Sequence, residues 1–115
     1  MSYLIWEFKT LNFTIRMTAE DEFDVDLSWD ESGEAAEKIA SGEWSVFCAK
    51  CAVLFEGVEI GTDYLGNCIY ADPKEFRDHI GMNAGGYGSY FSDMVRGAIR
   101  DARGAWHEFP KLRAA

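Results

Sequence analysis

Three cysteines and one histidine are the residues best suited to hold a metal ion. Cys48 and Cys51 are separated by two residues, and Cys68 and His79 follow further along the chain. Three thiolates with one imidazole form a common zinc set. The first pair, however, lies inside an apolar run, and residues three apart on a strand point to opposite faces. The pattern favours buried structural thiols, and a Cys/His metal-binding or redox module is the alternative interpretation.

The thiols also bear on redox compartment. Three is an odd count, and the N-terminal segment 1–7 lacks the basic region and small-residue cleavage site of a signal peptide. Both features argue against a disulfide framework. No apolar run approaches the roughly 18 residues of a membrane span. We therefore expect reduced thiols in a cytoplasmic protein with no membrane contact.

Carboxylates are the second chemistry-bearing group, and they are concentrated between residues 20 and 37. Apolar and polar residues alternate here, with Phe23, Val25, Leu27 and Trp29 on one side and Asp24, Asp26, Ser28 and Asp30 on the other. This is the period of a half-buried strand, which we expect from about Glu22 to Trp29. Carboxylates on its outer face would lie about 7 Å apart, close to the spacing of successive phosphates on a nucleic-acid strand.

Other sites are less consistent with the sequence. The alternating acids resemble part of a calcium loop, but Trp29 stands where that loop needs glycine and Ala35 where it needs glutamate. The glycine-rich segment 81–88 precedes a helix, yet it lacks the lysine and spacing of a nucleotide-binding loop. No nucleophile is paired with a base. We therefore predict a non-enzymatic protein without a cofactor.

The charge balance indicates the kind of partner. Eleven basic and twenty acidic residues give a formal net charge of −9. Direct binding to nucleic acid is disfavoured, because Lys and Arg supply the affinity for phosphates. A basic protein surface is the expected partner, although an acidic face can also be merely solvated.

Periodicity predicts the elements that position these groups. Residues 3–9 and 13–18 are expected to form either two short strands or one long bent strand. Further strands are expected at 22–29, 44–55 and 58–60, with a short one around 68–70, and helices at about 33–40, from 72 toward 81, and at 90–107. Glu56-Gly57 is interpreted as a hairpin turn. We predict a single α+β domain over residues 1–115, in which the long C-terminal helix and one or two short helices pack on an antiparallel sheet of about five strands. Residues 108–115 are expected to form a loose tail.

Three segments resemble one group of proteins. Asp26–Glu34, Gly61–Pro73 and Gly88–Arg100 look like parts of a family of small uncharacterised acidic proteins carried by proteobacterial phages and mobile elements. By analogy of context, the resemblance implies an inhibitor of host defence, such as the anti-CRISPR and anti-restriction proteins, several of which mimic DNA. It also implies that the protein acts in the host cytosol.

These inferences combine into one hypothesis. An acidic face mimics nucleic acid and blocks the basic nucleic-acid-binding surface of a host nuclease or CRISPR complex. The residues expected to bind the partner are Glu20, Asp21, Glu22, Asp24, Asp26, Asp30, Glu31, Glu34 and Glu37. An immunity or antitoxin protein would use the same attraction of acid to base. Aromatic residues (Trp6, Tyr64, Tyr70, Tyr87 and Tyr90) leave both a monomer and a homodimer open.

Overall fold

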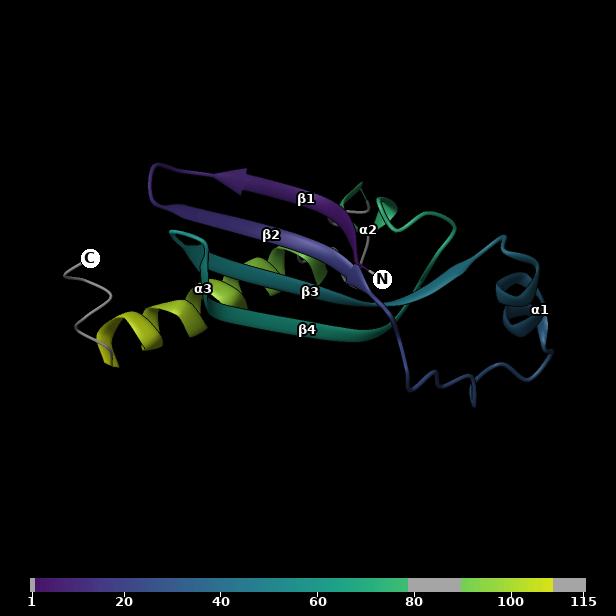
Figure 1. The fold of residues 1–115 in the computed structure, drawn as a ribbon. Coiled ribbons are helices and arrows are strands. Elements are labelled where there is room, and N and C mark those ends of the chain that lie inside the picture. Colours follow the sequence, from purple (N-terminus) through teal and green to yellow (C-terminus); the bar gives the residue numbers. More distant parts are fainter. Residues whose placement is uncertain (1, 79–89, 109–115) are drawn as a thin grey trace.

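The computed structural model describes residues 2–78 and 90–108 (Figure 1). This part of the chain contains four strands, which are β1 (Tyr3–Lys9), β2 (Phe13–Glu20), β3 (Ser45–Phe55) and β4 (Val58–Tyr70). Its helices are α1 (Glu34–Ser41), α2 (Glu75–Asp78) and α3 (Tyr90–Glu108). The fold is α+β, as predicted, with a four-stranded antiparallel sheet packed by the long C-terminal helix.

The strands follow one another across the sheet in the order β1-β2-β3-β4. The predicted hairpin turn between β3 and β4 is confirmed: Glu56 and Gly57 have φ values of 49° and 85°, and two positive φ angles match the right-handed twist of the paired strands. The strands predicted separately at 58–60 and 68–70 are one continuous strand, β4. Its register shifts opposite the step from Phe47 to Ala49, next to Asn67 with φ 53°.

The inner strand β3 carries the core, as its two apolar sides predict. Phe47, Ala49, Cys51 and Val53 are buried toward α3. On the opposite face, Ala52 and Leu54 are also buried, although no helix covers them in the described residues. The side chains paired with Leu54 across the sheet are Thr14 on β2 and Glu59 on β4, which lie beside it on this face.

Helix α3 lies directly over β4 and β3, and Gly61 allows this close approach. A Cβ atom at residue 61 would lie 2.5 Å from both the Ala98 carbonyl oxygen and the Ala102 amide nitrogen. Real Cβ atoms do not approach backbone atoms so closely. Only glycine at this position lets Ala98 and Ala102 of α3 pack directly against β4.

The predicted acidic strand is wrong. β2 ends at Glu20, and residues 21–33 contain neither helix nor strand. Phe23 and Trp29, expected to be packed, are 92% and 58% exposed. The sheet therefore has four strands instead of five. Glu20 is the last β2 residue with a β3 partner, Cys48, so the ladder stops where the expected strand would begin.

The helices follow their predicted bounds to different degrees. α1 and α3 each lie within a residue of the prediction, whereas α2 is a single turn after Asp72, whose carboxylate accepts the Lys74 amide at 3.0 Å. α1 lies beyond the end of the sheet (Figure 1), so it does not cover it as expected. The glycine-rich segment 81–88 and the tail from residue 109 lie outside the described residues.

Two glycine substitutions test the packing of α3. Gly61→Ala should lower the free energy of unfolding by about 1–3 kcal/mol, the usual cost of overpacking a filled site. Gly104→Ala should raise it by about 0.5–1 kcal/mol, because residue 104 lies in α3 with no atom within 4 Å of an added Cβ. Urea unfolding measures both. Equal effects of the two substitutions would contradict the close contact at Gly61.

Candidate partner-binding site

The expected site residues lie together on one projecting segment. We call residues 20–44, from the last residue of β2 to the residue before β3, the acidic arm. It leaves one end of the sheet, forms α1 beyond that end and returns to β3 (Figure 1). The Cα radius of gyration, 16.1 Å, exceeds the about 13 Å of a compact domain of this length, as expected for a chain with such a projection.

The arm carries the entire charge imbalance of the protein. It contains ten acidic residues and one basic residue, Lys38, a balance of −9 that equals the formal net charge of the whole chain. The remaining residues have as many acidic as basic side chains. The electrostatic field of the protein is therefore centred on the arm.

Asn67 fastens the arm to the sheet. Its amide donates to Glu22 Oε2 at 2.8 Å, and its Oδ1 accepts the Asp26 amide at 3.1 Å. Glu22 Oε1 also accepts the Asp24 amide at 3.0 Å. These donors favour the charged carboxylate, so they lower the pKa of Glu22 below its ordinary value. Glu22 is thus an anchor of the arm as well as one of its charges.

Two further carboxylates order the arm itself. Asp26 Oδ1 accepts the Ser28 amide at 3.0 Å, which lowers the pKa of Asp26. Asp30 accepts the amides of Ala35 and Ala36 at 3.3 and 3.0 Å and so satisfies the first turn of α1. Its negative charge also suits the helix dipole. Local turns, and not backbone pairing with a neighbouring strand, therefore hold the arm in its conformation.

A small apolar contact steadies α1. Ala35 is only 2% exposed and lines a cleft with Trp29 and Trp44. The Lys38 ammonium lies 4.5 Å from the centre of the Trp44 ring and 3.2 Å from Glu34 Oε1. The only base of the arm is therefore engaged within it.

Three of the nine predicted carboxylates remain directed to solvent. Asp24, Glu31 and Glu37 are exposed, and their carboxylates have no partner among the described residues. Glu20 and Asp21, by contrast, both interact with other groups of the protein, and the Glu20 carboxylate accepts a hydrogen bond from the Ser2 hydroxyl. All nine predicted residues thus lie on the arm. Some of them form hydrogen bonds or ion pairs within the protein, and the others face solvent.

Exposed apolar side chains are interleaved with these acids. Phe23 and Trp29 are largely exposed, and Val25 is exposed as well. The prediction placed all three in the core, and their surface role was missed. Aromatic residues concentrate binding energy at protein interfaces, and here they are exposed beside carboxylates on the same arm.

The cysteines are arranged as structural thiols. β3 places Cys48 and Cys51 on opposite faces, as predicted, and Cys51 and Cys68 lie in the core. Burial raises the pKa of Cys51 to about 12 and that of Cys68 to about 11. In residues 2–78 and 90–108, no group of three or more His, Cys, Asp and Glu side chains could hold a metal ion, and His79 lies outside these ranges.

Comparison with known proteins gives no relative from which a role can be transferred. No family model, no curated protein and no solved structure matches this chain. Within the described residues, no helix is long and apolar enough to cross a membrane. The resemblance to phage proteins stays a prediction.

The Glu22 anchor predicts a pH-dependent arm. Because its pKa is lowered on folding, its contribution to stability is present above the ordinary value of 4.5 and is lost as pH falls through the folded value. The amide proton resonances of Asn67 and Asp24 should therefore shift together on acidification, as NMR titration can show. Glu22→Gln should abolish this shared transition. An Asn67 amide that does not titrate in the wild type would contradict the anchor.

The thiols predict slow chemical labelling. A raised pKa keeps Cys51 and Cys68 protonated at neutral pH, and the thiolate is the reactive form. Alkylation followed by mass spectrometry should modify the half-buried Cys48 first and the other two only on unfolding in urea. Fast labelling of Cys51 in the folded protein would revive the redox alternative.

Proposed function

We propose that this protein is a non-enzymatic binding inhibitor that docks its acidic arm on the basic nucleic-acid-binding surface of a partner protein. The observation that carries the proposal is the confinement of the whole charge of −9 to one projecting arm. A charge kept only for solubility would have no reason to collect on one segment.

Binding would proceed in two stages. The field of the arm attracts a basic surface over roughly a Debye length, about 8 Å at physiological salt, and speeds encounter. On contact, the outward carboxylates Asp24, Glu31 and Glu37 pair with Lys and Arg side chains. Phe23 and Trp29 then lose water against apolar surface of the partner, which slows dissociation.

A nucleic-acid-binding partner suits this chemistry, because such proteins display dense Lys and Arg clusters that normally neutralise phosphates. The arm would take the place of the phosphates and compete with the nucleic acid. A spacing of carboxylates matched to a nucleic-acid strand is not part of the proposal, since it depended on the strand that does not form. The resemblance to phage proteins favours a host defence nuclease or CRISPR complex as the target.

The two alternative functional classes differ in how well the structure supports them. The alternative of a metal or redox module has little support, because Cys51 and Cys68 are core thiols whose pKa values are raised. An immunity or antitoxin protein uses the same arm against a basic toxin, and the identity of the captured partner distinguishes it from a defence inhibitor.

Two triple variants with the same net charge test the proposal. The arm variant carries Asp24→Asn, Glu31→Gln and Glu37→Gln, which leave the anchoring Glu22, Asp26 and Asp30 intact. The matched control carries Glu56→Gln, Glu59→Gln and Asp93→Asn, all outside the arm. The arm variant should bind a partner recovered from bacterial lysate roughly 3- to 150-fold more weakly, since each of three exposed ion pairs contributes about 0.2–1 kcal/mol.

The control triple should bind like the wild type. Phe23→Ser, which leaves the contact of Trp29 with Ala35 and Trp44 intact, should mainly speed dissociation in surface plasmon resonance. Added salt should weaken the complex, and nucleic acid that binds the partner should displace the protein. Equal recovery of the partner by both triple variants would contradict the proposed binding through the acidic arm.

A further inference from the structure

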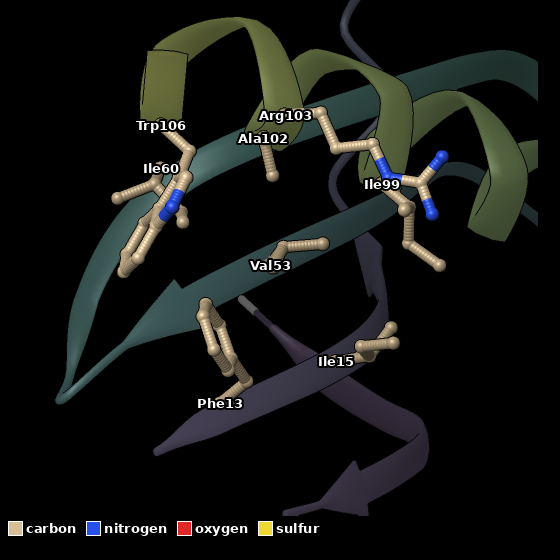
Figure 2. Close-up of a pocket in the computed structure, with 8 residues that line it drawn as sticks. All are labelled: Phe13, Ile15, Val53, Ile60, Ile99, Ala102, Arg103 and Trp106. Carbon is tan, nitrogen blue, oxygen red and sulfur yellow. The ribbon is translucent and has the colours of Figure 1, made fainter. Parts of the chain in front are cut away.

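An apolar groove lies under the C-terminal half of α3, away from the arm (Figure 2). Its volume is about 290 Å³, and it is lined by Phe13, Ile15, Val53, Ile60, Ile99, Ala102, Arg103 and Trp106. It exists because α3 packs over β4 and β3, which leaves side chains of β2 facing an open space beside the helix.

Aromatic packing closes one end of the groove. The Trp106 ring lies 5.6 Å from Phe13 and 5.1 Å from Phe55, measured between ring centres. Val53 forms the floor, with Ile15 beside it, and Ile99 hangs from the helix above (Figure 2). Apart from the Trp106 indole N–H, these side chains offer contact surface but no hydrogen bond, so a ligand here would have an apolar body.

Arg103 supplies the one charged group of the lining. Its guanidinium lies at the end of the groove away from Trp106 (Figure 2), and it has no acidic partner among the described residues. A guanidinium pairs with a carboxylate through two parallel hydrogen bonds. The groove is thus apolar along its length and positive at one end.

We propose that this groove binds a small amphipathic carboxylate, with the class of medium-chain fatty acids as the best fit. The alkyl chain would lie over Ile15 and Val53 toward Trp106, and the carboxylate would pair with Arg103. The volume, close to the lower limit of about 300 Å³ for ligand pockets, suits one small molecule. This site is independent of the partner-binding arm.

The charge of the arm does not oppose an anion at this groove. The arm and the C-terminal half of α3 lie at opposite ends of the sheet (Figure 1), in a molecule 55 Å long. Solvent-exposed charges separated by more than a Debye length, about 8 Å at physiological salt, are largely screened. The arm therefore does not cancel the positive charge of Arg103.

Titration of the full-length protein with decanoate and with decanol tests the proposal. Decanoate should shift the NMR signals of the Trp106 indole and the Ile15 methyl groups and should bind more tightly than decanol. Arg103→Gln should weaken decanoate binding by about tenfold to a hundredfold, the effect of losing a charged hydrogen bond, and should leave decanol unchanged. Arg100→Gln, an exposed neighbour outside the lining, should leave both unchanged.

Several results would overturn the proposal. The first is equal binding of decanoate to the wild type and to Arg103→Gln. The second is a groove whose signals ignore decanoate but change with protein concentration, which would make it an interface between copies of the chain. The third is a groove already in contact with the chain beyond residue 108 in the free protein.

Discussion

The close packing of α3 on β3 and β4 is the contact on which the other features depend. Gly61 lets the helix backbone reach the sheet, and the buried row from Phe47 to Val53 is the apolar surface that it covers. Removing such a row from water is the dominant favourable term in folding. Because α3 is narrower than the sheet and is seated over these two strands, part of β2 stays uncovered and the apolar groove forms beside the helix.

Much of this body could be predicted from local pattern. β3 is apolar on both sides, α3 repeats its apolar residues every three or four positions, and Glu56-Gly57 forms the expected turn. Each of these signals is contained in a short stretch and agrees with the tertiary environment. The continuity of β4 was missed, because Gly66 and Asn67 are strand breakers by type, whereas here they form an irregularity inside the strand.

The site was only partly predictable. The sequence located the acidic residues correctly but assigned them to a strand, since apolar and acidic residues alternate there. A strand also needs a neighbour with free backbone groups, and periodicity does not provide one. The carboxylates of Glu22 and Asp26 bind nearby amides instead, an alternative to ladder pairing open to short polar side chains. The hydrogen bond from the Asp26 amide to Asn67 Oδ1 joins residues that are 41 apart in the chain, and local sequence pattern does not predict such a long-range contact.

Segregation of charge onto the arm resolves a conflict between stability and binding. Ten acids within 25 residues repel one another, and inside the sheet that repulsion would oppose folding. Nine of these ten acids lie beyond the last β2–β3 pair, Glu20 with Cys48. Their repulsion therefore acts on a segment whose turns are stabilised by ionised carboxylates. The body, with equal numbers of acids and bases, folds on its apolar contacts. The arm can therefore keep a strong negative field and exposed aromatic side chains, the features on which the proposed binding depends, without weakening the core that carries it.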